Sequence, residues 1–380
     1  MFKFTPLFTL SLSATLMMVG VGMIVALLPQ RVHEMTGSLQ SVGLIASVFA
    51  LAYLLAQLPV GILSDRFGAR RFLIAGYCLC GFSGLMFFSA GSAGSIYLGR
   101  AIQGLGEAPI WALGPAVLSL AYPDTKGRAI GIYNAAIHAG LTLGPLLGLL
   151  LAPSGESRLP FAVFAGLCFG AGLLVLLFLR DGAGKAGTGR SGFSARAFLS
   201  LLGRRRPAII LVGILLYGSG YGVFVSVLPV SLMELKGFGP AAVNFLFVLF
   251  YAAISLSQVT AGILSDRLGR QGFMVLGLLA AAGGLAVFPV FPGHWVYLPL
   301  GLASTGLGIF CVASIAALNE SVPEDFKGAI SGCYYFFWGA GYMLGPYLTG
   351  ALASHAPLTG YLLLALLLAA QALALWFLGD

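Results

Sequence analysis

The stretch GILSDRFGARR, residues 61–71, decides the fold of this chain, because a near copy, GILSDRLGRQG, occupies residues 262–272. The two copies begin 201 residues apart in a chain of 380. Charged residues make up only 8% of the sequence, so a charged motif that occurs twice indicates an internal repeat. We therefore predict two similar halves, each of which carries the motif at the same place.

The composition is that of a membrane protein. Hydrophobic residues make up 59% of the sequence, and the mean hydropathy is +0.98. A helix needs about 20 mostly apolar residues to cross roughly 30 Å of hydrocarbon. Twelve such spans are predicted, and they leave no room for a soluble domain. The spans are 7–28, 40–62, 72–90, 95–119, 129–151, 159–179, 208–229, 241–262, 273–291, 296–318, 329–352 and 358–378.

Further pairs of segments follow the same repeat. The sequence ALLPQRVHEM at 26–35 aligns with SVLPVSLMEL at 226–235. The first span therefore has a counterpart, so we expect it to be part of the fold and not a cleaved signal peptide. Between the halves lies a stretch rich in Gly and Arg that is typical of a linker, with a short surface helix expected at 194–202. The predicted domains are an N-terminal six-helix bundle at 1–180, a cytoplasmic linker at 181–206 and a C-terminal six-helix bundle at 207–380.

Lysine and arginine are unevenly distributed over the loops. With the N-terminus placed inside, the inner segments hold sixteen of them and the outer segments hold three, Arg31, Arg158 and Lys236. Lys and Arg collect on the cytoplasmic side of membrane proteins. We therefore predict a multi-pass protein of the cytoplasmic (inner) membrane with both termini cytoplasmic. The net charge of +8 then reflects topology and contact with anionic lipid, and nucleic-acid binding is not expected.

Several classes of function lack their sequence signals. A phosphate loop, a His-Glu-x-x-His metal motif and a Gly-x-Ser-x-Gly motif within a span are all missing from the sequence. We therefore expect neither an enzyme nor a nucleotide-driven pump, and no cofactor or metal. A monomer is expected. The five cysteines fall inside predicted spans, which argues against a disulfide framework or a zinc cluster; they are Cys78, Cys80, Cys168, Cys311 and Cys333.

In this setting the two charged motifs resemble a family signature. GILSDRFGARR and GILSDRLGRQG are similar to the loop between spans two and three of the major facilitator superfamily and to its weaker copy between spans eight and nine. The resemblance covers essentially the whole chain. It implies an all-α membrane protein with twelve transmembrane helices in two six-helix bundles related by an internal repeat. It also implies alternating access.

The resemblance further implies a role for the motif residues in conformational gating. Asp65 is expected to pair with a neighbouring Arg and with a helix N-terminus of the other half, which steadies one access state. Gly61 and Gly68 are expected to permit close helix approach and a tight turn. The alternative is a solvated loop whose charges only fix topology. The implied gating residues are Gly61, Asp65, Arg66, Gly68, Arg70, Asp266 and Arg267.

Two more segments of the first half resemble signatures of the superfamily. LGRAIQGLGEA at 98–108 is similar to its fourth-span motif, and GLTLGPLLG at 140–148 is similar to the fifth-span Gly-Pro motif of its antiporters. The second motif places the chain nearest to the drug:proton antiporter-like branch. It predicts a helix bend, or else a packing device of the whole repeat, because the eleventh span has a similar pattern. The residues concerned are Gly140, Gly144, Pro145, Gly148, Gly345 and Pro346.

Three ionisable residues lie well within predicted spans, and all belong to the first half: Arg100, Glu107 and His138. A charge in the membrane costs about 2.5–3.5 kcal/mol on insertion scales, so each such residue needs a reason. At a rise of 1.5 Å per residue, Glu107 lies about 18 Å into its span and His138 about 14 Å, near the midplane. Arg100 lies about 8 Å in, so the alternative for it is a topological anchor that extends outward.

Helical spacing groups these residues with others. Arg100, Gln103, Glu107 and Trp111 fall within roughly 80° of one helix face. Asn134, His138 and Thr142 follow one another at a spacing of four on the next span. The second half has Leu300, Ala303 and Leu307 where the first has Arg100, Gln103 and Glu107, so the fold forms without these polar groups. We predict a site for proton coupling or substrate at Glu107, Arg100, His138, Gln103 and Asn134, with a structural salt bridge as the alternative.

Aromatic residues of the second half are candidates for the wall of the cavity. Tyr217, Tyr221 and Phe224 recur at helical spacing on the seventh span, and Tyr334 and Trp338 on the eleventh. Such stripes also occur in lipid-facing or core packing. If they line the cavity together with Trp111, they favour flat or amphipathic organic substrates.

The sequence therefore predicts a secondary active transporter of a small organic solute, most simply a proton-coupled exporter (antiporter). The first span has no acidic residue, unlike many cation exporters of the family, so the alternative is proton-coupled uptake or exchange of an anionic metabolite. The third alternative is a membrane receptor that does not transport a solute. The expected partners are the substrate, protons and the lipid bilayer.

A first prediction concerns the doubled turn. Asp65→Asn is expected to reduce transport more than Asp266→Asn, because only the first copy has two arginines, Arg70 and Arg71, after its glycine. Transport by the two variants is compared in the same vesicle preparation at equal protein content. Equal losses, or a larger loss for Asp266→Asn, would contradict a special role for the first turn.

Overall fold

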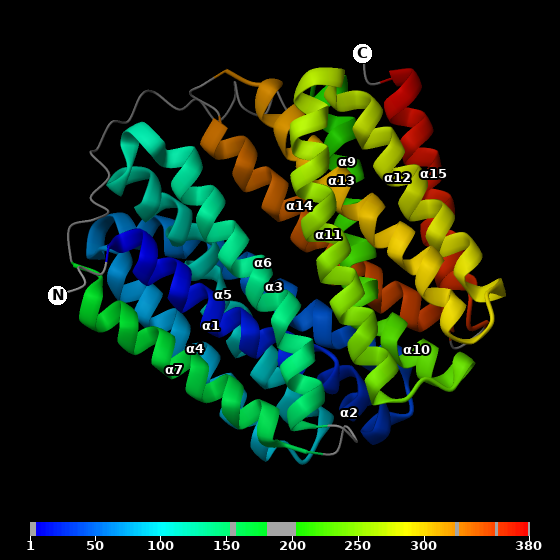
Figure 1. Ribbon diagram of the computed structural model, residues 1–380, viewed down its shortest axis with the longest axis horizontal. Helices are drawn as coiled ribbons and strands as arrows, with labels where there is room; N and C mark the ends of the chain where they lie inside the picture. The colour runs from blue at the N-terminus through cyan, green and yellow to red at the C-terminus, as the bar shows by residue number, and fades with distance from the viewer. Residues whose placement is uncertain (1–4, 153–156, 181–202, 324–326, 354–355, 379–380) are drawn as a thin grey trace. The chain divides into compact units, whose positions relative to one another are not determined.

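The structure is a computed structural model, and the part of the chain that it describes is helical (Figure 1). It describes residues 5–152, 157–180, 203–323, 327–353 and 356–378. Within the helices, the side chains of residues 58, 62, 65, 66, 126–128, 327–329, 331 and 378 are outside this description. The short helix expected at 194–202 also lies outside the described residues.

Each of the twelve predicted spans corresponds to a helix, which confirms the predicted fold class. The first and seventh spans continue, after a break, into a short second helix. Three short 3-10 turns, η1 (Pro123–Thr125), η2 (Phe288–Val290) and η3 (Gly293–Val296), join longer elements. The α-helices are α1 (Pro6–Val25), α2 (Leu27–Thr36), α3 (Leu39–Phe67), α4 (Ala69–Ser89), α5 (Ala93–Ala121), α6 (Lys126–Leu151), α7 (Leu159–Phe178), α9 (Arg205–Val225), α10 (Val227–Lys236), α11 (Pro240–Leu268), α12 (Arg270–Val287), α13 (Tyr297–Glu320), α14 (Lys327–Ala353) and α15 (Thr359–Leu378).

Most of these helices are long and apolar enough to cross a bilayer. Over the described residues, ten helical segments meet both conditions. The two remaining long helices are α5, with 29 residues, and α14, with 27, and both are long enough for a span. The polar stripe predicted on α5 is one reason for its lower hydropathy. The chain is a multi-pass membrane protein.

The internal repeat is visible in the backbone as well as in the sequence. Gly68 separates α3 from α4 with φ +87°, and Gly269 separates α11 from α12 with φ +93°. Gly37 ends α2 and Gly237 ends α10 in the left-handed region, with φ +64° and +65°. Residues with a side chain rarely adopt such angles. The doubled motif therefore includes the same glycine turn in both halves.

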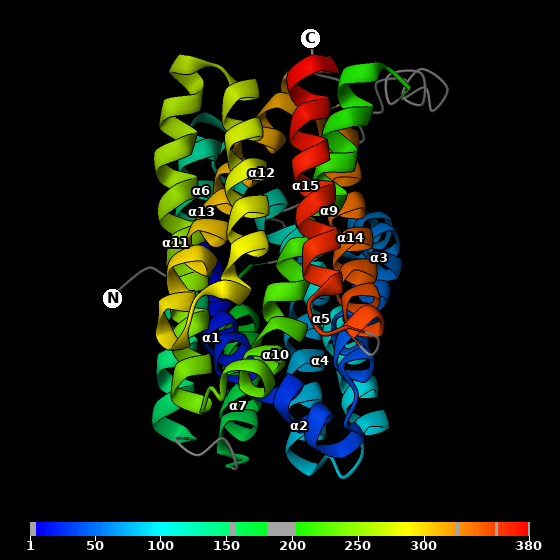
Figure 2. The same cartoon turned by 90° about the vertical axis from the view of Figure 1, so that its right-hand side faces the viewer.

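The chain divides into two compact units. Unit 1 comprises residues 1–37, 48–189 and 238–248, and unit 2 comprises residues 38–47, 190–237 and 249–380. In unit 1, α1 packs on α6 and α7, and α4 packs on α5 and α7 (Figure 1). In unit 2, α9 packs on α14 and α15, and α12 packs on α13 and α15 (Figure 2). The helix pairs of one unit thus correspond one to one with those of the other.

Glycines allow the equivalent pairs α1/α6 and α9/α14 to approach closely. A Cβ atom on Gly144 would lie 2.5 Å from the carbonyl oxygen of Val19, and one on Gly345 would lie 2.5 Å from the Cα atom of Ser219. Pro145 and Pro346 lie inside α6 and α14 next to these contacts. Small residues let membrane helices pack with their backbones in contact. The Gly-Pro pattern therefore packs helices in both units, and a bend with a role in transport stays a prediction.

This packing makes a prediction that two glycines of α6 test together. Gly144→Ala is expected to lower Tm, because the new methyl group meets backbone atoms of α1, and overpacking costs about 1–3 kcal/mol. Gly131→Ala is the matched control, since none of the described atoms beyond its own stretch of helix lies within 4 Å of its Cβ position. Alanine favours a helix over glycine by roughly 1 kcal/mol, so this control is expected to keep or raise Tm. Equal Tm values for the two variants would show that the α1/α6 contact can relax.

Candidate functional site

The polar stripe predicted on α5 is a continuous chain of hydrogen bonds. The helix begins at a capping box in which Ser92 and Ser95 bond each other's backbone N–H groups, and this fixes its first turn. Spacings of three and four residues then place Arg100, Gln103, Glu107 and Trp111 on one face. Each of these side chains bonds to the next one.

Arg100 lies at the start of this chain. Its Nη1 atom donates to Oε1 of Gln103 at 2.9 Å. Its Cζ atom lies 4.4 Å from the centre of the Phe49 ring on α3, a distance at which a cation and an aromatic face attract each other. The side chain is buried, with 9% of its surface exposed. Arg100 is thus held by a partner on its own helix and by one on a neighbouring helix.

Glu107 accepts one hydrogen bond on each carboxylate oxygen. Nε2 of Gln103 donates to Oε1 at 2.9 Å, and Nε1 of Trp111 donates to Oε2 at 3.2 Å. Gln103 is fully buried, and 5% of Glu107 is exposed. A buried carboxylate needs such donors because it has lost most of its water. Gln103 bonds both charged residues at once, so its amide links Arg100 to Glu107.

Trp111 contacts Glu107 through its indole N–H group. The sequence placed Trp111 on the polar stripe but gave it a possible role as a wall of the cavity. Indole N–H is a donor only, so the contact suits an ionised carboxylate. Phe49 is a residue that the sequence reasoning missed. No signal within α3 singles it out, because its role depends on how α3 packs beside α5.

The polar residues of α6 do not belong to this chain. In the part of the chain that the structure describes, the buried Nδ1 of His138 has no hydrogen-bond partner, and the hydroxyl of Thr142 donates to the carbonyl of His138 at 2.9 Å. Asn134 is exposed. Within the described residues, no hydrogen bond joins any of the three to Glu107. The structure therefore joins Arg100, Gln103, Glu107 and Trp111 by hydrogen bonds and, among the described residues, joins neither His138 nor Asn134 to them in this way.

The equivalent face of α13 shows that the fold does not need this polar chain. Leu300, Ala303 and Leu307 stand at the positions that correspond to Arg100, Gln103 and Glu107, and all three are fully buried. The helix pairs α4/α5 and α12/α13 pack alike, with Gly76 facing Gly106 and Gly277 facing Gly306. An apolar face is therefore sufficient for packing at this place.

The gating residues are described in the second copy of the motif. Arg270 forms an ion pair with Asp266, bonds the hydroxyl of Ser265 at 2.7 Å and pairs with Glu320 at 3.2 Å. Glu320 ends α13, and the sequence gave no sign of its part in this cluster. Arg267 is exposed. These contacts join the ends of α11, α12 and α13.

The first copy of the motif is described only in part, because the side chains of Asp65 and Arg66 lie outside the described residues. Arg70 donates to the carbonyl of Leu176 near the end of α7. Gly68 forms the expected tight turn. Among the described atoms, none from outside its own stretch of helix lies within 4 Å of the Cβ position of Gly61, so these atoms show no close approach there. The gating role of these residues stays a prediction.

The aromatic residues predicted in the second half form one cluster in unit 2. The ring of Tyr221 lies 5.8 Å from Trp338, 6.3 Å from Tyr217 and 5.1 Å from Phe250 on α11. Tyr334 precedes Trp338 by four residues on the same helix, and its hydroxyl oxygen lies 3.4 Å from the Sγ atom of Cys311. Tyr221 and Trp338 are half-buried, so part of each ring remains accessible. The cluster thus joins α9, α11 and α14.

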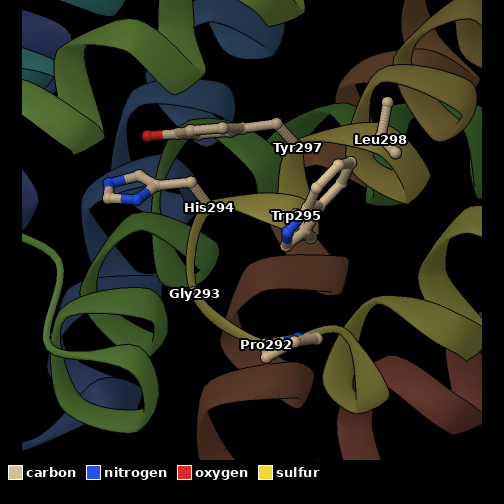
Figure 3. Close-up of a pocket in the computed structure, with 6 residues that line it drawn as sticks. All are labelled: Pro292, Gly293, His294, Trp295, Tyr297 and Leu298. Carbon is tan, nitrogen blue, oxygen red and sulfur yellow. The ribbon is translucent and has the colours of Figure 1, made fainter.

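A separate pocket lies at the turn between α12 and α13, with a volume of 530 Å³ (Figure 3). The rings of His294 and Tyr297 face each other there at 5.8 Å, and Trp295 is 66% exposed. Exposed aromatic residues of this kind are typical of the boundary between lipid and water. None of the predicted site residues lines this pocket. We therefore do not assign the transport site to it.

Comparison with known families decides the identity of the fold. The sequence model described as Major Facilitator Superfamily matches residues 10–239 and 210–380. The chain belongs to the major facilitator superfamily. This confirms the resemblance seen in the doubled motif, and the family consists of transporters. The protein is therefore a membrane transporter and not an enzyme.

Relatives of this superfamily member differ in what they are named for. The tetracycline resistance protein, class G, of Vibrio anguillarum is 25% identical over 82% of this chain and 81% of its own length. The fosmidomycin resistance protein of Escherichia coli strain K12 is 25% identical over 93% of this chain and 87% of its own length. A mutant of the nucleoside transporter NupG has a similar structure, with a TM-score of 0.81, 14% identity and 98% of both chains covered. That likeness shows the fold alone.

The hydrogen bond from Nε1 of Trp111 to Oε2 of Glu107 leads to a prediction about stability. Trp111→Phe is expected to lower Tm, because one buried carboxylate oxygen loses its donor, and a hydrogen bond to a charged group contributes about 1.5–3 kcal/mol. Trp295→Phe is the control, since that side chain is largely exposed. Thermal unfolding of the two purified variants is compared. A Tm equal to that of the control would mean that the indole N–H does not stabilise Glu107.

Proposed function

We propose that this transporter is a proton-coupled exporter of a small organic compound, and that Glu107 carries the proton. The observation that supports this most is the site on α5: a buried carboxylate with a donor on each oxygen, linked to Arg100 through Gln103. Burial disfavours the charged form of a carboxyl group, and donors favour it. These opposed effects suit a group that gains and loses a proton during each cycle.

A purely structural role explains this site less well. The corresponding face of α13 packs with leucine and alanine alone. A buried charge that is removed from water is weak evidence for stability, and apolar replacements are often as stable. The polar groups of α5 therefore represent a cost to the fold that a function in coupling accounts for.

Export is the direction we propose, working as antiport. Two relatives are named for resistance to tetracycline and to fosmidomycin, and removal of a compound from the cell is one route to resistance. In an antiporter, proton and substrate bind in alternation, so protonation of Glu107 from outside would release the substrate there. The ionised carboxylate would then favour loading from the inside.

The remaining predicted residues take supporting roles in this proposal. The aromatic cluster around Tyr221 and Trp338 would contact a flat or amphipathic substrate. His138 is the second candidate for the proton, and Asn134 is a candidate for substrate contact. The charged turns and their glycines would favour one access state over the other, and the Gly-Pro segments of α6 and α14 would set how the helices bend.

We also propose the membrane setting that the charge distribution predicts. The protein would reside in the cytoplasmic membrane as a monomer with both termini inside, since Lys and Arg are concentrated on that side. The two six-helix halves, 1–180 and 207–380, would be joined by a cytoplasmic linker at 181–206.

A second candidate function is uptake or exchange of an anionic metabolite together with protons. The observation in its favour is Arg100, a buried cation close to the proposed proton site. The direction of proton movement separates the two candidates. Substrate added to one side of a vesicle drives protons the opposite way in an antiporter and the same way in a symporter.

The proposal is tested on purified protein in proteoliposomes with a pH-sensitive dye inside. A thermal-shift screen at two pH values, which includes tetracycline and fosmidomycin, first finds a compound that binds the folded state. In wild-type vesicles, a gradient of that compound is expected to move protons. Glu107→Gln keeps the size of the side chain but cannot titrate, so it is expected to abolish proton movement while exchange of labelled substrate continues.

Glu34→Gln serves as the matched control for this substitution, because Glu34 is exposed on α2. It is expected to leave proton movement unchanged. If the Glu107→Gln protein folds and still concentrates substrate when protons alone supply the energy, the coupling assignment is wrong. His138→Gln is then the next variant to measure. If the wild-type protein moves no solute under these conditions, the result would favour a membrane receptor that does not transport.

A further inference from the structure

The two nitrogen atoms that donate to Glu107 cannot accept a hydrogen bond from it when the carboxyl group takes up a proton. Nε1 of Trp111 and Nε2 of Gln103 carry hydrogens and can only donate. An ionised carboxylate only accepts, so the observed pattern fits Glu107 in its ionised form. A protonated carboxyl group has an O–H that must donate, and neither of the two bonded nitrogen atoms can accept it.

One acceptor within reach along this polar chain is Oε1 of the same Gln103 amide, which now accepts from Arg100 at 2.9 Å. Rotation of the terminal amide of Gln103 by half a turn would bring Oε1 toward Glu107, where it could accept the new O–H. The same rotation would turn Nε2 toward Arg100. Arginine is a donor only, so two donors would then face each other and this bond would be lost.

We infer that Gln103 is a positioning residue that transmits the protonation state of Glu107 to Arg100 by rotation of its side-chain amide. This inference rests on the proposed function and deepens it. With Glu107 ionised, the amide holds Arg100 beside the Phe49 ring. With Glu107 protonated, the amide turns and Arg100 leaves this position. Proton binding at one residue thus alters the place of a positive charge two helical turns away.

The helices packed around Glu107 carry further titratable groups, which include Tyr53 on α3 and Tyr77 on α4, the latter with a buried hydroxyl. Arg100 lies on α5, Cys80 on α4 and Cys168 on α7, and both thiol side chains are fully buried. Thiols, with an ordinary pKa of about 8.5, are largely uncharged near neutral pH. On α6, the hydroxyl of Tyr133 donates to the carbonyl of Ile110 at 3.0 Å, and His138 is separate from the chain. Helix α1 has no titratable side chain, and α2, which also packs on α5, carries Arg31, His33 and Glu34.

The full burial of Gln103 limits the partners that its side-chain amide can have. None of its surface is exposed, so water does not take the place of either partner. A leucine at this position would remove both bonds and replace the amide with an apolar side chain of similar size. Protonation of Glu107 would then no longer alter the position of Arg100.

The test measures how readily Arg100 reacts with phenylglyoxal, a reagent selective for arginine, at an acidic and an alkaline pH. Mass spectrometry of the purified full-length protein gives the labelling of Arg100 relative to that of Arg204, which is exposed. The ratio corrects for the effect of pH on the reagent. In the wild type, we expect the ratio to be several-fold higher at acidic pH, where Glu107 is protonated and Arg100 has left Gln103.

Three variants complete the experiment. Gln103→Leu is expected to give a high ratio that no longer changes with pH, and Glu107→Gln a ratio that is constant with pH. Thr142→Val on α6 is the control and is expected to behave as the wild type. Gln103→Met, with a longer and more flexible side chain, repeats the measurement if Gln103→Leu has a low Tm. A purely structural Gln103 would change Tm but leave the response of Arg100 to pH intact.

The result also separates this inference from the proposed function. A wild-type ratio that does not change with pH, or a normal pH response in Gln103→Leu or Gln103→Met, overturns the amide mechanism. Proton movement in vesicles of the same preparations tests Glu107 independently. Lost coupling in Glu107→Gln together with a normal response in Gln103→Leu would retain the proton site and reject the role of Gln103. Retained coupling in Glu107→Gln would reject the proton site itself.

Discussion

A charge inside a lipid bilayer is stabilised only by the protein around it, and this constraint governs the first half of the molecule. Arg100 and Glu107 have lost most of their water, so each needs protein partners. Gln103 bonds both residues, Phe49 contacts Arg100, and Trp111 donates to Glu107. The result is a polar chain along α5 in which each side chain bonds to the next one.

The rest of the fold provides the rigid frame that such a chain needs. Glycines at the α1/α6 and α4/α5 contacts let backbones meet, which limits how far these helices can shift. The same contacts recur at α9/α14 and α12/α13 with apolar residues in place of the polar chain. One architecture is therefore used twice, and the two copies differ in chemistry: the first carries ionisable groups, and the second carries a cluster of aromatic rings.

The second copy also shows how the charged turn is held together. Arg270 contacts Asp266, Ser265 and Glu320 and so connects the ends of three helices. A network of this kind ties the helix ends to one another. Gly269, with its positive φ, allows the turn that brings these groups within reach.

The sequence by itself determined the spans, the repeat and the face of α5 that carries Arg100, Gln103 and Glu107. These follow from hydropathy, from the 200-residue offset and from the period of the helix, which depend on the order of residues alone. Only the tertiary structure decided that Phe49 lies under Arg100, that Trp111 donates to Glu107, that Nδ1 of His138 is buried without a described hydrogen bond and that Glu320 joins Arg270. Those contacts depend on side-chain rotamers and on which helices become neighbours, and neither is encoded in the spacing of residues along one helix.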